Sequence, residues 1–218
     1  MHVQRRSVPH SAPADITEMQ VEAIVEAACQ MKKQGCDPRP YIMVPLVALV
    51  EELEHQLRSC RAVADHVMES QGVRVPIQWG TMIEVPRAAL VANKLAALSD
   101  FFSFGTNDLT QMTLGFSRDD AQAKFLEPYI RLGVLQRDPF ETIDRVGVGA
   151  LVRMACEQAR RANPAIKLGI CGEHGGDPES VAFFHATGLD YVSCSPLRVP
   201  IAMLASAQAN VRGYLASE

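Results

Sequence analysis

The alternation of short apolar runs with longer amphipathic segments constrains the fold of this chain more than any other feature. The run at 101–104 is too short for a helix, and the run at 41–47 is apolar on both faces, which is typical of a parallel strand covered by helices. The segments between the runs repeat apolar residues at the three- and four-residue steps of helices. The sequence therefore predicts an α/β fold with about five strands, at 41–47, 76–86, 101–104, 167–171 and 191–195.

A polar turn follows the third predicted strand. Gly105 accepts backbone angles closed to other residues, and Thr106, Asn107 and Asp108 then place oxygen acceptors and an amide just past the strand. The carboxyl ends of parallel strands are where α/β proteins bind their substrates. Asp108 is thus a candidate for binding a cation or for binding a proton of the substrate. Alternatively, it caps a helix that begins at Leu109.

Glu84 repeats this arrangement at the end of the second predicted strand, two residues before Pro86. It precedes Asp108 by 24 residues, the length of one strand, helix and strand unit, so the two carboxylates are expected to converge. Two carboxylates with open positions suit a hard divalent cation such as Mg²⁺, which keeps waters for a substrate. The alternative is that Glu84 pairs with Arg87.

The fourth predicted strand ends at Cys171 and runs into a glycine-rich loop that contains His174. A cysteine at this position is a candidate thiol acid or nucleophile, although a lone strand cysteine also serves as a small buried hydrophobic residue. His174 is a candidate base or ligand, or a structural residue. The sequence leaves these alternatives open.

Length and composition indicate a globular protein. The 218 residues carry 21 Lys and Arg against 25 Asp and Glu, a net charge of -4, so no basic field attracts nucleic acid or an anionic membrane. No apolar stretch reaches the roughly 20 residues that span a bilayer, and the start lacks the apolar region of a secretory signal. We therefore expect a cytoplasmic protein without nucleic-acid or membrane partners.

Two segments are predicted to be irregular. Residues 1–15 lack a periodic apolar pattern and are expected to form a disordered leader ahead of a single domain at 16–218. Residues 113–148 carry several turn signals, which predicts a surface excursion. A connection of this length serves as a lid or binding loop, or it serves only packing or oligomer contacts.

Four motifs together resemble the C-terminal, phosphoenolpyruvate-binding barrel of the pyruvate phosphate dikinase family. The likeness covers about residues 16–210 and is carried, in order, by the runs at 80–87, 101–112, 169–178 and 190–196. The Cys-Gly-Glu-His-Gly-Gly form that starts at Cys171 is more similar to the dikinase than to phosphoenolpyruvate synthase or to enzyme I of the phosphotransferase system. Those two enzymes are the nearest alternatives.

The resemblance implies a partial (β/α)₈ TIM barrel of the phosphoenolpyruvate/pyruvate superfamily, with the fourth to eighth strands present. In such a barrel Glu84 and Asp108 hold Mg²⁺, and the run from Gly105 to Asp108 lines the phosphoenolpyruvate pocket. Cys171 protonates the enolate of pyruvate. The implied reaction of the whole enzyme converts ATP, pyruvate and phosphate to AMP, phosphoenolpyruvate and diphosphate.

Several parts of the family's enzyme have no counterpart in these 218 residues. They are the first three barrel strands with their phosphate-clamping arginines, the nucleotide-binding domain and the domain with the phosphorylated histidine. We therefore expect the chain alone to be inactive and to expose two sheet edges and an apolar face. The full-length family is expected to form homodimers. Alternatives of another class are a truncated non-catalytic remnant, an interaction subunit, or a metal-dependent lyase of the same superfamily.

Overall fold

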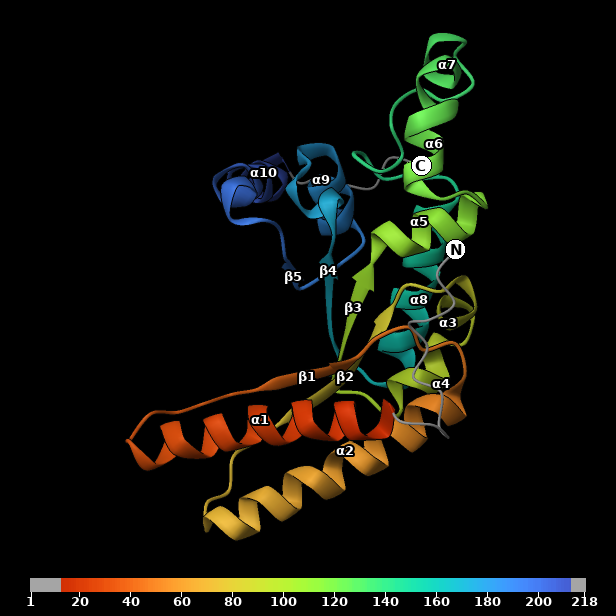
Figure 1. Cartoon of the computed structure of the whole chain (residues 1–218). Coiled ribbons are helices and arrows are strands. Elements are labelled where there is room, and N and C mark those ends of the chain that lie inside the picture. The colour runs from red at the N-terminus through yellow and green to blue at the C-terminus, as the bar shows by residue number, and fades with distance from the viewer. Residues whose placement is uncertain (1–12, 213–218) are drawn as a thin grey trace.

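The computed structural model describes residues 13–212 (Figure 1). Helix α1 (Pro13–Lys33) begins three residues before the Ile16 start that the sequence predicts. A proline suits this place, because its fixed φ fits the first helical turn and its missing N–H has no partner there in any case. The last three residues of the predicted leader at 1–15 are therefore helical, and residues 1–12 lie outside the described residues.

The sheet has five parallel strands in the order β1-β2-β3-β4-β5. They are β1 (Tyr41–Val44), β2 (Gln78–Ile83), β3 (Phe101–Gly105), β4 (Lys167–Cys171) and β5 (Tyr191–Val192). Sequential parallel neighbours joined by helices are the architecture of a barrel wall, so the predicted α/β class and partial barrel are confirmed. Within residues 13–212, β1 and β5 each pair with a strand on one side only.

Helices make every connection between successive strands. The connecting helices are α2 (Val50–Gln71), α3 (Pro86–Leu90), α4 (Ala92–Ala96), α5 (Thr106–Leu114), α6 (Arg118–Lys124), α7 (Leu126–Arg131), α8 (Val148–Ala162) and α9 (Pro178–Ala186), with the short 3₁₀ turn η2 (Glu173–Gly176). The 3₁₀ turn η3 (Pro196–Arg198) and helix α10 (Val199–Arg212) follow β5. The chain leaves α2 at Gly72, whose left-handed backbone (φ 65°) suits glycine. At the start of α9, the Asp177 side chain accepts the Ser180 N–H at 2.8 Å.

Two connections differ from the sequence prediction. The helix expected over 87–98 is two short helices that meet at Val91, a β-branched residue with non-helical angles (φ -116°, ψ 23°). The excursion at 113–148 is more regular than expected, because it contains α6 and α7. A small apolar cluster of its own holds it together, in which the ring of Phe116 packs edge-on against Phe125 and Phe140.

The alternation of side chains along β3 separates the core from the site. Phe102 and Phe104 are fully buried on the face that the helices cover. Ser103 and Gly105 point to the opposite face, which is the inside of the partial barrel. Buried residues on α1, α2, α4 and α8 continue the same core around the outside of the sheet (Figure 1). Among the described helices, none combines the length and apolarity that crossing a bilayer requires.

Candidate functional site

A cavity of about 510 Å³ lies at the carboxyl ends of β2, β3 and β4. Its lining residues are Pro45, Leu46, Met82, Glu84, Gly105, Asn107, Asp108, Cys171 and Gly172. Five of the six residues to which the resemblance assigns a role in binding or catalysis are among them. The exception is Thr106, which is buried beside the cavity and bonds elsewhere.

The register of the parallel strands explains this convergence. Ile83 lies beside Phe104, and Gly105 lies beside Cys171. Glu84 follows Ile83 directly, so its side chain reaches the level of Gly105 and Cys171. The position predicted for Glu84, at the mouth of a strand next to the strand that leads to Asp108, is confirmed.

The side chain of Glu84 is only 4% exposed and lies between the turn after β1 and Gly105 of β3. Its Oε1 accepts the backbone N–H of Leu46 at 2.7 Å. Its Oε2 faces Gly105, where a Cβ atom would lie only 2.8 Å away. Glycine at 105 therefore makes the room that this carboxylate occupies. Arg87, the alternative partner considered above, donates to the carbonyl of Ala48.

Asp108 lies inside the first turn of α5, because that helix begins at Thr106 and not after Asp108. The N-cap residue is Gly105 and no side chain caps the helix, so the alternative reading of Asp108 as the cap is wrong. The partial positive charge of a helix N-terminus favours a carboxylate here. Gln111 donates to Oδ1 of Asp108 at 3.0 Å and so helps to orient it.

His174 joins three segments around the cavity and is completely buried. Its Nε2 lies 2.9 Å from the carbonyl oxygen of Pro139, and its Nδ1 lies 2.7 Å from the Thr106 hydroxyl. A carbonyl only accepts, so the proton of the neutral ring is on Nε2 and Nδ1 accepts from Thr106. Burial lowers the pKa of His174, which keeps the ring neutral. With both nitrogens bonded away from the cavity, His174 fits the structural alternative.

Asn107 and Gly172 bring the loop after β4 against the start of α5. The side-chain oxygen of Asn107 accepts the Glu173 N–H at 3.3 Å. Gly172 adopts φ 132°, a conformation that residues with a Cβ rarely take, and a Cβ there would lie 3.1 Å from that same oxygen. The close approach places Cys171 beside the Asn107–Asp108 turn.

Cys171 presents a half-buried thiol to the cavity. Burial raises the pKa of this thiol above its ordinary value; a hydrogen bond from Ser103 lowers it, and the carboxylates of Glu84 and Asp108 raise it. The net shift is upwards, so the thiol is protonated at neutral pH. A neutral thiol can give up a proton, whereas a nucleophile needs the thiolate.

Comparison with known families identifies the family of this chain. The profile described as PEP-utilising enzyme, PEP-binding domain, matches residues 5–211. The chain belongs to this family. The relatives include pyruvate, phosphate dikinase of Flaveria trinervia, 60% identical over 194 residues, and pyruvate, phosphate dikinase 2 of Zea mays, 59% identical over 194 residues. Each alignment covers 89% of this chain but only 20% and 22% of the relative, so the chain spans about a fifth of their length.

A solved structure supports the fold of this PEP-binding domain. A citrate lyase from Burkholderia xenovorans superposes on 91% of the chain and 55% of its own length, with a TM-score of 0.57 and 19% identity. At that identity the likeness concerns the fold alone, and the fold is a TIM-barrel type. Together with the sheet order, it supports a partial barrel.

Sequence reasoning missed several residues around the cavity of the PEP-binding domain, Pro45 among them. Leu46 and Met82 line it as apolar wall residues, and no polar signal marked them. Ser103 contacts both Cys171 and Tyr191 through its hydroxyl. Its position was readable, because it is the single polar residue in a run of phenylalanines and shares a strand face with Gly105.

The donor set of the PEP-binding domain suits a hard cation. Within residues 13–212 no group of three or more His, Cys, Asp and Glu residues gathers closely enough to hold a metal by itself. Mg²⁺ does not need such a cage, since it commonly binds one or two carboxylates and completes its shell with waters and substrate oxygens. Glu84 and Asp108 offer oxygen donors of this kind on one cavity.

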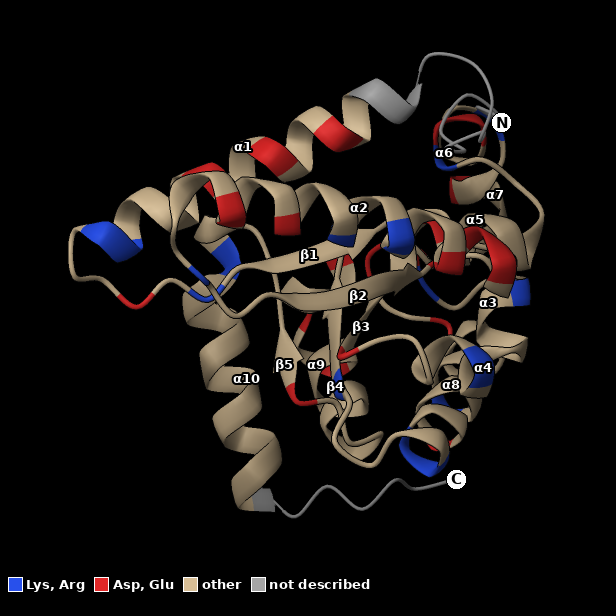
Figure 2. Ribbon diagram, turned by 90° about the horizontal axis from the view of Figure 1, so that it is seen from below, with Lys and Arg blue, Asp and Glu red and all other residues tan. Residues whose placement is uncertain are grey.

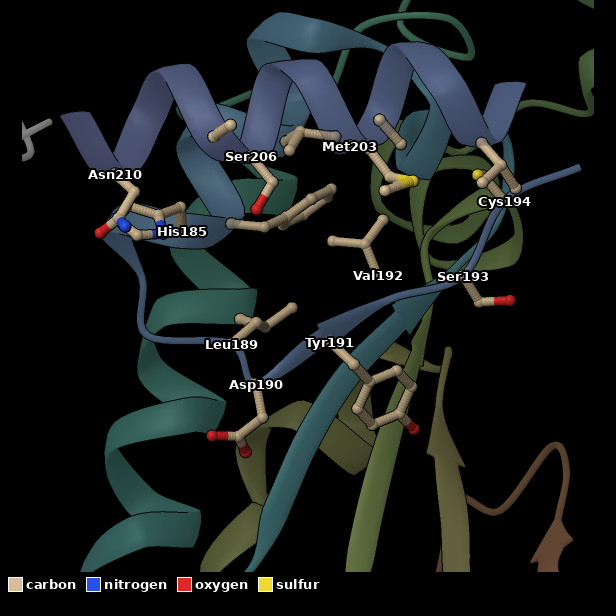
Figure 3. Close-up of a pocket in the computed structure, with 15 residues that line it drawn as sticks. His185, Leu189, Asp190, Tyr191, Val192, Ser193, Cys194, Met203, Ser206 and Asn210 are labelled. Carbon is tan, nitrogen blue, oxygen red and sulfur yellow. The ribbon is translucent and has the colours of Figure 1, made fainter. Parts of the chain in front are cut away.

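A larger groove of about 790 Å³ lies at the other edge of the sheet, between β5, α9 and α10. Figure 3 shows Met203 and Ser206 of α10 pointing towards Leu189 and Val192 near β5. Residues 190–194 of the fourth motif line this groove, but none of the six residues that the resemblance assigns to binding or catalysis does. Size alone therefore does not identify the functional cavity of this domain.

Proposed function

We propose that this chain is the phosphoenolpyruvate- and pyruvate-binding part of a phosphotransferase of the pyruvate phosphate dikinase type. One observation carries the proposal: the carboxylates of Glu84 and Asp108 and the thiol of Cys171 share the cavity at the ends of β2, β3 and β4. The 60% identity to a pyruvate, phosphate dikinase favours this activity over the synthase and enzyme I alternatives.

In this proposal Glu84 and Asp108 hold Mg²⁺ and the substrate. A bound Mg²⁺ supplies positive charge to the enolate and phosphoryl oxygens. Gly105 leaves room for Glu84, and Asn107 and Asp108 form the polar wall of the substrate pocket. Thr106 contributes through its hydrogen bond to His174, which fixes the turn, because its side chain does not line the cavity.

Cys171 is assigned the proton step. When the bond between phosphorus and oxygen of phosphoenolpyruvate breaks, the phosphoryl group goes to a histidine on another domain and the enolate of pyruvate remains. The enolate electron pair forms a carbon–hydrogen bond with the proton of Cys171 Sγ, which leaves a thiolate. In the opposite direction the thiolate takes a methyl proton from pyruvate. The raised pKa of the thiol suits its role as the acid.

The proposed reaction needs further groups besides those of this chain. The phosphorylated histidine, the nucleotide site and the arginines of the first three strands are supplied from outside these residues, so the chain alone is expected to be inactive in the dikinase assay. A homodimer of the full-length enzyme belongs to the same proposal. Several relatives are named as chloroplastic, whereas the sequence of this chain predicts the cytoplasm.

The test compares Cys171→Ala with wild type in the presence of the upstream segments of a dikinase of the family, joined as a fusion or added as a separate chain. The assays are exchange of solvent deuterium into the methyl group of pyruvate and binding of phosphoenolpyruvate. We expect exchange to be lost while binding persists, because the thiol is needed only for the proton. The matched control is Cys194→Ala, a half-buried cysteine in the groove near β5, which should exchange like wild type.

Exchange by Cys171→Ala at the wild-type rate would contradict the assigned role. In that case the thiol is a core residue, and the acid must be another group at the cavity. Loss of phosphoenolpyruvate binding together with exchange would equally count against a pure proton role, because it would place the thiol in substrate binding.

A further inference from the structure

Leu46 has an unusual backbone conformation at the edge of the cavity. Its φ is 56°, and among the described residues it is the only one other than glycine with a positive φ. Leucine pays a steric penalty in this left-handed region, so the surrounding structure must impose it. Leu46 lies in the turn after β1, next to Pro45, and both line the cavity.

The turn is fixed on both sides of Leu46 by residues of β2 and α3. The Thr81 hydroxyl donates to the carbonyl of Val44 at 2.8 Å, and the Arg87 guanidinium donates to the carbonyl of Ala48. These anchors lie two residues before and two residues after Leu46. They leave the turn little freedom to relax to an ordinary conformation.

The left-handed angle aims the N–H of Leu46 at Glu84, whose Oε1 accepts it at 2.7 Å. A hydrogen bond to a carboxylate is stronger than one between neutral groups and fixes the orientation of the acceptor. Oε2 of the same carboxylate faces Gly105 on the neighbouring strand. The turn thus sets the plane of the Glu84 carboxylate relative to the turn that carries Asp108.

We propose that Leu46 is a positioning residue, whose strained backbone N–H orients Glu84 for the divalent cation. The inference rests on the proposed role of Glu84 as a metal ligand and adds the group that aligns it. Groups that orient a ligand from outside the coordination shell typically change metal affinity by about 10- to 100-fold. The backbone of Leu46, and not its side chain, makes the contact.

The test removes this N–H alone. Residue 46 of the 218-residue chain is replaced by the α-hydroxy analogue of leucine, which exchanges the N–H for an ester oxygen and keeps the side chain. Leu49 gives a matched control, since its N–H also donates to a carboxylate, that of Glu52 in the first turn of α2, at 2.9 Å. Mn²⁺ alone is the probe, and the free ion is measured by electron paramagnetic resonance.

We expect the ester at position 46 to weaken Mn²⁺ binding by about tenfold or more and the ester at 49 to leave it unchanged. Leu46→Gly should bind Mn²⁺ like wild type, because glycine adopts this φ freely and keeps the N–H. Circular dichroism confirms that each variant is folded before titration.

Equal Mn²⁺ affinity of wild type and the 46 ester would overturn the inference while leaving the metal site intact. A loss in Leu46→Gly as large as that in the ester would also overturn it, since the side chain would then be the important group. If wild type itself binds no Mn²⁺, the proposed metal role of Glu84 fails first, so the two failures are distinguishable.

Discussion

The centre of the sheet and its β5 edge differ in how many neighbouring strands support them. The cavity with Glu84, Asp108 and Cys171 rests on β2, β3 and β4, each of which has a paired strand on both sides. The groove beside β5 has a two-residue edge strand as its floor. Hydrogen bonds to neighbouring segments hold the polar side chains of the cavity, Glu84, Asn107 and Asp108. Because the strands below the cavity are paired on both sides, these side chains have fixed positions.

Helix α10 shows the contrast most clearly. From residue 199 to 211 it carries no charged side chain, and it appears in the neutral colour along its described length in Figure 2. Ile201, Met203 and Leu204 on it are 42%, 68% and 60% exposed. Apolar side chains that stay exposed contribute little to stability, so the two regions should respond differently to substitution.

The largest expected difference concerns stability. Phe102→Ala removes a fully buried ring from the central strand, and we expect it to lower the free energy of unfolding by about 3–5 kcal/mol. Met203→Ala on α10 should change it by less than about 0.5 kcal/mol, because the side chain is already exposed. Urea unfolding followed by circular dichroism measures both. If Phe102→Ala and Met203→Ala lower the free energy of unfolding by similar amounts, the two regions do not differ in their contribution to stability.

A second prediction concerns metal affinity. The Cβ of Gly105→Ala would lie 2.7 Å from the sulfur of Met82 and 2.8 Å from Glu84 Oε2, so the carboxylate must shift. We expect Mn²⁺ affinity to fall by about tenfold. Gly188→Ala at the end of α9 is the control: its positive φ (81°) makes alanine costly by about 1 kcal/mol, but nothing lies within 4 Å of the new Cβ. If both variants weaken Mn²⁺ binding equally, general destabilisation is the cause.

A smaller effect is expected in the pH dependence of stability. Burial lowers the pKa of His174 in the folded state more than the hydrogen bond with Pro139 raises it, and Asp177, Arg118 and Asp138 add smaller, partly cancelling contributions. The unfolded chain therefore binds more protons below about pH 6.5, so stability is full above that pH and is lost as the pH falls from there through the lower folded pKa.

His174→Gln should flatten this loss between about pH 7 and 5, whereas His185→Gln, at an exposed position lining the open groove, should retain it. The measurement is the urea midpoint at a series of pH values, with both variants compared with wild type. An unchanged slope in His174→Gln would mean that other groups cause the pH dependence.

Local pattern was sufficient to predict the sheet and most of the candidate site. The position of Glu84 followed from its place at the end of an apolar run, and that of Cys171 from the glycine-rich turn after it, because strand ends in a parallel sheet meet at one edge. The resemblance to the family supplied the roles and the partial barrel. The apolar pattern predicted one continuous helix at 87–98, because the spacing of apolar residues does not reveal the break at Val91.

The remainder depends on tertiary contacts that no local pattern encodes. The left-handed turn at Leu46 follows from anchors on β2 and α3, and leucine carries no signal for it. The structural role of His174 depends on Pro139, which lies 35 residues earlier in the chain. The start of α5 at Thr106 was also missed, since a polar run after a strand is equally compatible with a loop.

The central claim is that Glu84 and Asp108 form one cation site that is already assembled in this chain. The direct measurement is a titration of Mn²⁺, followed by electron paramagnetic resonance, for wild type, Glu84→Ala and Asp108→Ala, with the exposed helix residue variant Asp119→Ala as control. Loss of an outer partner of a metal ligand costs about 10- to 100-fold, so loss of either ligand should cost at least that much, and the control should bind like wild type. Unchanged affinity in both Glu84→Ala and Asp108→Ala would contradict the account.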